Sequence, residues 1–458
     1  MIDPPGVAHG VSRVGPRLCR ATGGSRPGRR RNAATADTAT VSGSREAVRG
    51  FPGVARRQLA LMVLVQILAL SVWFSASAVL PALRGEWGLD RQGGIWLTAT
   101  VQIGFAVGAV VSAALNLADR IAPQRLLAAA ALLGATCTAL ITVLADSAWM
   151  AAPLRLLTGV AMAGVYPVGL KIVVSWYPRA RGMALGVLIG ALSVGSALPQ
   201  LLTTVAVLPW RSVLLAASAL AVLGAVVSVA FLRQGPDARP APPLDPRYVL
   251  RMFADRPQRL INLGYFGHMW ELYALWAWLP AYITASYLRS TGTAGPVAVG
   301  ATAFAVIGVA GAAGCVLAGR FAERHGSARV ALAAMLLSSG CAIASVAVFS
   351  APPVVLLGLL LVWGAAVVAD SAQFSAALSD AADPRYVGTA LTAQTAIGFL
   401  LTVVTIAVLP TLADTVGWRL AVPVLAVGPL LGAVAMTRLI RSTSGGQFRA
   451  RPDSGVSP

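Results

Sequence analysis

Four ionisable side chains lie inside long apolar stretches of the sequence: Arg155, His268, Glu271 and Asp370. Because a charge in the hydrocarbon region of a bilayer is costly, such residues are typical of substrate paths and proton relays. An arginine keeps its charge and can bind a carboxylate or an oxyanion through two parallel hydrogen bonds. A carboxylate or an imidazole in the same setting can take up and release a proton. The residue types therefore predict anion binding coupled to proton transfer.

The spacing of these residues places several of them on shared helix faces. His268 and Glu271 are three residues apart, as are Asp370 and Gln373, so each pair lies on one face of a helix. Structural roles stay open, since Arg155 could pair with a buried acid or extend to the membrane interface. We expect the substrate to contact Arg155, Trp73, Trp270, Tyr273 and Gln373, and protons to be carried by Glu271, His268 and Asp370.

The composition is that of a membrane protein with many spanning helices. Of the 458 residues, 57% are hydrophobic and only 12% are charged, and the mean hydropathy is +0.74. A soluble domain carries about 25% charged residues. About twenty apolar residues in a helix cross a bilayer core of roughly 30 Å, and such stretches recur along the chain. The predicted fold class is all-α integral membrane.

Several chemistries are excluded by what the sequence lacks. Lys171 is the single lysine and ends no glycine-rich phosphate loop, so the chain alone cannot drive transport with ATP. The four cysteines form no C-x-x-C pair, and neither a metal site nor a cofactor is expected. The net charge of +19 would suggest nucleic acid in a soluble protein, but here the basic residues follow a membrane topology. We expect a carrier that is not an enzyme and binds no nucleic acid.

Twelve apolar segments divide into two six-helix halves. A basic tail without apolar periodicity, expected to be disordered, precedes them, and a charged, proline-rich linker joins them. The predicted regions are the tail 1–57, the N-terminal half 58–232, the linker 233–258, the C-terminal half 259–440 and a disordered tail 441–458. The predicted helices are 58–83, 94–117, 125–145, 149–175, 181–206, 211–232, 259–286, 295–318, 329–349, 353–377, 386–411 and 417–438.

The basic residues predict which side of the membrane each loop faces. Apart from Arg155, nearly all of them fall on the side of both termini, which the positive-inside rule makes cytoplasmic. We therefore expect a multi-pass protein of a bacterial inner membrane with both termini in the cytoplasm. The basic residues on the opposite side are Arg84, Arg91, Arg211, Arg289 and Arg419.

One loop pattern occurs twice, 204 residues apart, after the second helix of each half. Each copy has an acid followed at once by an arginine, with a second arginine six residues after the acid. Parallel repeats joined by a long linker are a known transporter plan. We expect these loops to act as a cytoplasmic gate, made by Asp119, Arg120 and Arg125 in the first half and by Glu323, Arg324 and Arg329 in the second.

With these motifs the chain resembles the major facilitator superfamily, over roughly residues 58–440. The loop signature of that family, G-x-x-x-D-R-x-G-R-R, is followed by Gly319, Glu323, Arg324, Gly326 and Arg329. The first copy departs from it, since Leu115 and Ala122 replace its glycines. The fourth predicted helix carries the family's R-x-x-x-G pattern as Arg155 to Gly159.

The resemblance implies a fold of two pseudo-symmetric halves in which helices 1, 4, 7 and 10 line a central cavity. The four membrane-embedded ionisable residues fall on helices 4, 7 and 10, as this fold requires. The antiporter signature of the fifth helix is missing, because the segment ends Gly195-Ser196-Ala197-Leu198-Pro199 without a Gly-Pro pair.

These features together predict a monomeric secondary transporter that works by alternating access, most simply proton-coupled uptake of a small organic or inorganic anion. Proton-driven efflux of cationic or amphipathic compounds is the alternative, since two carboxylates and an aromatic helix 7 would suit an organic cation. A membrane sensor or scaffold without transport is a third possibility. The expected partners are the substrate, protons and the lipid bilayer.

Overall fold

The computed structural model describes residues 52–177, 181–205, 208–238 and 244–449. The predicted disorder of 1–57 and 441–458 therefore lies largely outside the described residues, as do Pro240, Pro242 and Pro243 of the linker. Two boundaries differ: helix α2 already begins at Pro52, and α20 continues to Arg449. No proline follows Pro429 until Pro452, so nothing in the backbone forces an earlier end of α20.

The described residues form helices and no strands, in agreement with the predicted all-α membrane fold. Ten helical stretches among them are long and apolar enough to cross a membrane. The last of these, Val387–Ser442, is interrupted at Gly417, which has φ 77° and ψ 159°, so it holds two helices. Helix α13 (Arg256–Thr291) is long enough, but its polar residues keep it outside the ten. Hydropathy therefore supports the predicted count of twelve only in part.

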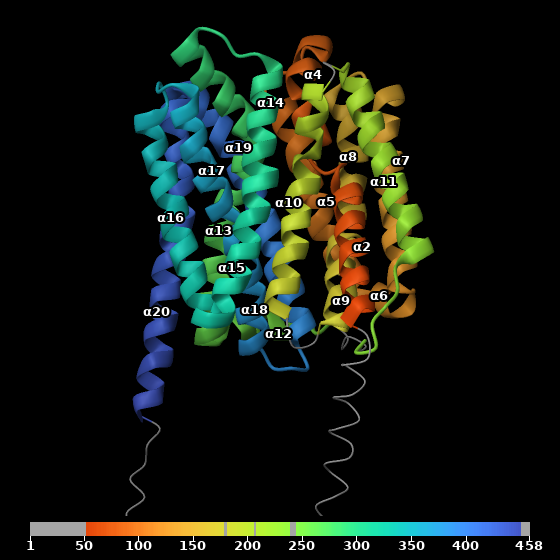
Figure 1. The fold of residues 1–458 in the computed structure, drawn as a ribbon, viewed down its shortest axis with the longest axis vertical. Coiled ribbons are helices and arrows are strands. Elements are labelled where there is room, and N and C mark those ends of the chain that lie inside the picture. The colour runs from red at the N-terminus through yellow and green to blue at the C-terminus, as the bar shows by residue number, and fades with distance from the viewer. Residues whose placement is uncertain (1–51, 178–180, 206–207, 239–243, 450–458) are drawn as a thin grey trace, which may run out of the picture. The chain divides into compact units, whose positions relative to one another are not determined.

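The N-terminal half begins with a helix in three pieces and continues with five further spans (Figure 1). Its elements are α2 (Pro52–Leu70), α3 (Ser75–Ala78), α4 (Leu80–Trp87), α5 (Arg91–Ala114), α6 (Leu117–Arg120), α7 (Pro123–Leu144), α8 (Ala148–Ala163), α9 (Tyr166–Trp176), α10 (Arg181–Val205) and α11 (Trp210–Phe231).

The C-terminal half follows a short helix in the linker, which sequence reasoning missed. That helix is α12 (Pro246–Ala254), with Tyr248 and Met252 buried. The other elements are α13, α14 (Pro296–Phe304), the π-helix η1 (Ala305–Ala310), α15 (Gly311–His325), α16 (Ser327–Val348), α17 (Pro353–Ala369), α18 (Ser371–Ala381), α19 (Val387–Ala421), the 3-10 helix η2 (Val422–Ala426) and α20 (Val427–Arg449).

Three helices predicted as continuous are broken near their middles. The first predicted helix is interrupted at residues 71–74, the fourth between Ala163 and Tyr166, and the tenth at Asp370. Pro167 explains the second break, since its nitrogen cannot donate to the carbonyl of Ala163. The breaks in the fourth and tenth helices lie at corresponding places of the two halves, as the internal repeat predicts.

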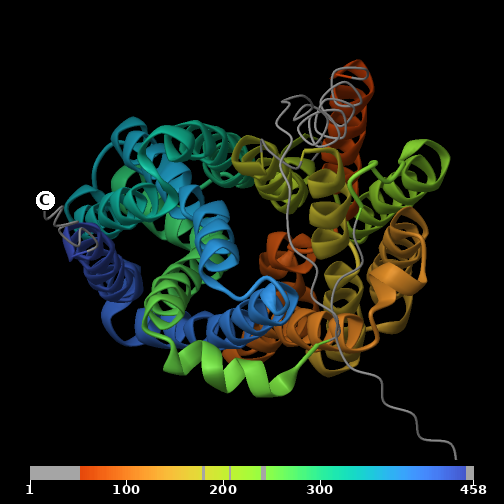
Figure 2. The same ribbon diagram turned by 90° about the horizontal axis from the view of Figure 1, so that it is seen from below.

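Both halves contact each other along two helix pairs. Helix α5 contacts α19, and α10 contacts α15, as the view in Figure 2 also shows. Helix α2 begins and α20 ends at the same end of the bundle, where α6, α9, α12 and α18 also lie (Figure 1). We call this the basic end and the other, where α4 lies, the opposite end.

Small residues allow close helix contacts inside and between the halves. A Cβ on Gly104 would overlap the carbonyl oxygen of Leu156, and one on Gly108 would lie 2.7 Å from that of Val160, so α5 and α8 touch through their backbones. On α10, a Cβ on Gly186 would lie 2.7 Å from the carbonyl oxygen of Cys315 in α15. The glycines of α5 and α10 therefore allow close packing, those of α10 between the halves.

Candidate functional site

Arg155 is buried, with 1% of its surface exposed, and its guanidinium is bound to backbone carbonyls. Its Nη1 donates to Val72 O at 3.0 Å, Nη2 donates to Trp73 O, and Nε donates to Leu97 O at 3.4 Å. The first two carbonyls lie in the break of the first helix. Arg155 thus satisfies acceptors that the break releases from helical pairing.

Two serines reinforce the same break. Ser71 Oγ donates to Leu68 O and Ala217 O, and Ser75 Oγ donates to Val72 O at 2.9 Å. Serine hydroxyls that bond to nearby carbonyls compete with helical hydrogen bonds. The break at residues 71–74 therefore follows from three side chains, those of Arg155, Ser71 and Ser75, which is why no proline or glycine signals it.

The break presents Trp73 to a cluster of aromatic rings, the central aromatic cluster, in which the two halves meet. Phe105 and Phe399 stack with ring centroids 4.1 Å apart, and Trp73 lies 5.0 Å from Phe105 and 5.8 Å from Tyr273. All its members are at least 95% buried. The cluster consists of Trp73, Phe74 and Phe105 from the N-terminal half and Tyr273, Trp276 and Phe399 from the C-terminal half.

Buried polar atoms without a hydrogen-bond partner gather on the same helices. They include the indole nitrogens of Trp73 and Trp276 and both amide atoms of Gln66 and Gln102. A buried donor left unpaired costs about 1–3 kcal/mol, so native proteins rarely keep several. Unpaired indole and amide N–H groups on α2, α5 and α13 are what a solute with hydrogen-bond acceptors would satisfy.

His268 of α13 and Asp370 meet at the break of the tenth helix, a contact that the sequence analysis did not predict. His268 Nδ1 lies 2.7 Å from Asp370 Oδ1, and His268 Nε2 lies 2.8 Å from Ser371 Oγ. The contact with Asp370 is close but not aligned as a hydrogen bond, since Oδ1 remains among the unpartnered atoms. Gln373 Nε2, also buried, is unpartnered nearby in sequence. A hydroxyl, an imidazole and a carboxylate in contact can pass a proton from one side chain to the next.

Glu271 is held apart from this group, inside the C-terminal half. Its Oε1 accepts from Trp363 Nε1 at 2.7 Å, and both oxygens lie 2.7 Å from Ser338 Oγ. Its partners are on α16 and α17, whereas those of His268 are at the α17–α18 break. Although Glu271 and His268 are three residues apart on α13, the structure does not bring them into one network.

The predicted substrate contacts divide between two places. Trp73 and Tyr273 lie in the central aromatic cluster, but Trp270 donates to Val424 O at 3.1 Å and packs against helix α20. Sequence reasoning gave no role to Phe105, Phe399 or Trp363, because an aromatic residue in an apolar helix carries no signal of which neighbour it faces.

Among the described residues, no ion pair joins the predicted gate residues of one half to the other half at the basic end. Asp119 pairs with Lys171 of its own half at 2.5 Å, and the ion pairs of the described residues include none of the other five. Gly326 in the second loop has φ 84°, a conformation that favours glycine and explains this position of the motif.

The ion pair that does join the halves lies at the opposite end and was not predicted. Arg91 at the start of α5 pairs with Asp414 in α19. Close by in the sequence, Glu86 of α4 accepts from Trp210 Nε1 at 2.5 Å and from Arg211 at 2.8 Å. These bonds, that from Trp210 first, lower the pKa of Glu86. Sequence reasoning did not predict these pairs, because the two members of each pair lie far apart in the chain.

Comparisons with known proteins agree with this architecture. The family model described as Major Facilitator Superfamily matches residues 62–401. No curated protein sequence matches significantly. Similar solved structures include a bacterial homolog of the human lysosomal transporter Spinster, inward-facing and unoccupied, at 15% identity and TM-score 0.63, covering 86% of this chain and 98% of that one. The proton:xylose symporter XylE is similar at 14% identity and TM-score 0.67, covering 84% of this chain and 95% of that one. The human organic anion transporter MFSD10 is similar at 19% identity and TM-score 0.63, covering 83% of this chain and 99% of that one. At these identities the likeness concerns the fold alone.

Proposed function

Because the chain belongs to the major facilitator superfamily, we propose that it is a secondary transporter that carries a small organic or inorganic anion together with protons. It works by alternating access, as a monomer in the cell membrane with both termini in the cytoplasm. Names of similar structures include a proton-coupled symporter and an organic anion transporter, which is compatible with this assignment.

The observation that carries the proposal is the set of unpaired donors on α2, α5 and α13 and at the break of the first helix, two of which belong to the central aromatic cluster. The indole N–H groups of Trp73 and Trp276 and the amides of Gln66 and Gln102 are buried and lack partners. Donors of this kind suit the oxygen atoms of an anion. Arg155 acts on the substrate mainly by fixing the backbone that carries Trp73, since three of its five N–H groups go to carbonyls.

His268 and Asp370 are the proposed proton site. The helix breaks there, Asp370 Oδ1 has no aligned donor, and Ser371 connects the imidazole to a half-exposed position. Glu271 is less suited, because it already accepts from the hydroxyl of Ser338 and the indole of Trp363. The Arg91–Asp414 pair would close the opposite end and open as the halves rock.

Efflux of organic cations is the second candidate. Aromatic rings attract cations, and the unpartnered oxygen of Asp370 could bind an ammonium group. This candidate predicts that cations, and not anions, move protons.

The test is proton flux in liposomes that contain the purified protein and a trapped pH-sensitive dye. Pooled small anions, then pooled organic cations, are added to the wild type and to Trp73→Phe and Trp276→Phe, which keep a ring but lose the N–H. We expect anions to drive proton entry and each variant to raise the half-saturating concentration about tenfold, the value of one hydrogen bond. Trp270→Phe is the matched control, since its N–H is bound to Val424 O.

A second pair of variants locates the proton site. Asp370→Asn should abolish proton-driven accumulation and leave anion exchange intact, whereas Glu271→Gln should retain accumulation. The reverse result would move the proton site to Glu271. Proton movement only with cations would replace the anion assignment with efflux.

A further inference from the structure

A hollow lies on the surface of the C-terminal half, and no residue of the central aromatic cluster lines it. It is an apolar groove between α15, α16 and α17 with a volume of about 510 Å³. Leu317, Phe321 and Leu337, each about 51–52% exposed, form its rim. Because these helices are membrane spans, the side chains at this rim face lipid.

Small side chains make this surface hollow. Gly314, Ala333, Ala365 and Ala369 line the groove and offer at most a methyl group each. A Cβ on Gly314 would overlap the carbonyl oxygen of Ala365, so α15 and α17 touch through their backbones. The groove is therefore closed at its floor by the helices and open only toward the bilayer. Its shape fits a hydrocarbon chain.

Two residues with basic side chains stand at the basic end of the groove. His325 and Arg329, both exposed, line it there, and neither takes part in an ion pair among the described residues. His325 Nδ1 donates to Phe321 O at 3.1 Å, so Nε2 can donate to an anion when the ring carries both protons.

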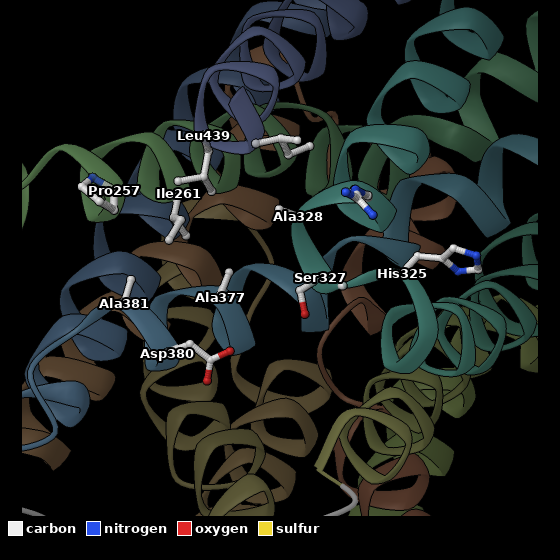
Figure 3. Close-up of a pocket in the computed structure, with 12 residues that line it drawn as sticks. Pro257, Ile261, His325, Ser327, Ala328, Ala377, Asp380, Ala381 and Leu439 are labelled. Atoms are coloured by element: carbon white, nitrogen blue, oxygen red, sulfur yellow. The ribbon is translucent and has the colours of Figure 1, made fainter. Parts of the chain in front are cut away.

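The charges around the two residues are mostly positive. Arg320 and Arg324 are exposed on the same stretch of α15, and Glu323 is the single acid of residues 311–348. A neighbouring hollow shares His325 and Arg329 and has Asp380 of α18 on its wall (Figure 3). Both hollows therefore share Arg329 and His325.

We propose that the groove is a binding site for one anionic phospholipid of the leaflet at the basic end. One acyl chain lies along the alanine-lined groove, and the phosphate binds Arg329 and His325. An acyl chain gains little over bulk lipid by itself, since both surroundings are apolar. Selectivity must therefore come from the head group, and basic pockets between spanning helices are suited to anionic lipids.

The site has a direct connection to the contact between the halves. Helix α15 lines the groove with one face and packs against α10 with another, where a Cβ on Gly190 would lie 3.2 Å from Ala312. A lipid bound behind α15 would hold the helix that the N-terminal half must slide against.

Native mass spectrometry of the delipidated full chain tests the proposal. Phosphatidylglycerol, phosphatidylcholine and inorganic phosphate are titrated separately. We expect one phosphatidylglycerol to bind at least tenfold more tightly than phosphatidylcholine. Arg329→Gln should weaken the binding of phosphatidylglycerol about fivefold, which is the contribution of one basic residue near an anionic membrane surface. Ala333→Phe, at an exposed position of the groove, should weaken it by steric filling.

Arg441→Gln and Leu336→Phe are the matched controls, since both positions are exposed outside the groove, and they should bind as the wild type does. Equal binding of both lipids, or wild-type binding by Arg329→Gln and Ala333→Phe, would overturn the proposal. Binding that inorganic phosphate displaces, and that Ala333→Phe leaves unchanged, would make the site a plain anion site and also overturn it.

Discussion

Replacement of Arg155 by methionine separates a structural role of this residue from direct substrate binding. The side chain is 1% exposed and makes two well-placed bonds to the carbonyls of Val72 and Trp73, and a long one of 3.4 Å to Leu97. A hydrogen bond to a charged group contributes about 1.5–3 kcal/mol, so two contribute roughly 3–6 kcal/mol. Removing a buried guanidinium regains part of this, because its burial is itself costly.

The balance predicts that Arg155→Met lowers the free energy of unfolding by about 3 kcal/mol. Val72 O would retain its hydrogen bond from Ser75 Oγ, whereas the carbonyl of Trp73 would lose its hydrogen bond from Arg155. Arg155→Lys should lose roughly half as much, since an ammonium keeps the charge but has one donor atom. Unfolding in mixed detergent and dodecyl sulfate micelles, followed by tryptophan fluorescence, measures both.

Arg211→Met is the control, because Arg211 is 49% exposed in its pair with Glu86 and its loss should change stability little. If Arg155→Met were as stable as the wild type, Arg155 would not stabilise the break at residues 71–74. If that variant were stable but bound its anion more than tenfold more weakly, Arg155 would instead be a direct ligand.

Three further predictions concern packing, the opposite end and pH. Gly104→Leu should abolish the monodisperse peak in size-exclusion chromatography, because the new side chain would overlap Leu156. Gly340→Leu should keep that peak, because the space around Gly340 is open. Equal peaks for the two variants would contradict the close contact of α5 and α8. Arg91→Glu should lengthen the distance between spin labels at Gly85 and Val416, because it breaks the ion pair with Asp414. Adding Asp414→Arg should restore the wild-type distance. An unchanged distance in Arg91→Glu would mean that the Arg91–Asp414 pair does not hold the halves together. Hydrogen bonds from Arg385 lower the pKa of Asp383 to about 2, so the stability from this pair is present above the ordinary carboxyl pKa and is lost as the pH falls through about 2. Arg385→Gln should therefore unfold more easily than the wild type at pH 6, by a small amount for so exposed a pair. The difference should shrink near pH 2 and vanish near pH 1. A difference that is as large at pH 1 as at pH 6 would contradict this cause.

The sequence by itself determined the class of protein and the plan of its chain. Long apolar stretches that end in charged loops can be satisfied only by membrane-spanning helices, since each backbone group must be paired within its own segment. The repeated loop of Asp119 and Glu323 predicted two related halves. The few charges inside the apolar stretches predicted the fourth, seventh and tenth helices as functional, and the family match agrees with the predicted class of protein.

Only the tertiary structure decided which residues meet. At about 100° per residue, His268 and Glu271 point roughly 60° apart on α13, which is enough for one to face Asp370 and the other Ser338. Helix rotation and tilt, which depend on all neighbours at once, set this difference. The break that presents Trp73 needs Arg155 from 82 positions away, so no local pattern could predict it. For the same reason the Arg91–Asp414 pair and the stacking of Phe105 on Phe399 emerged only from the packed structure.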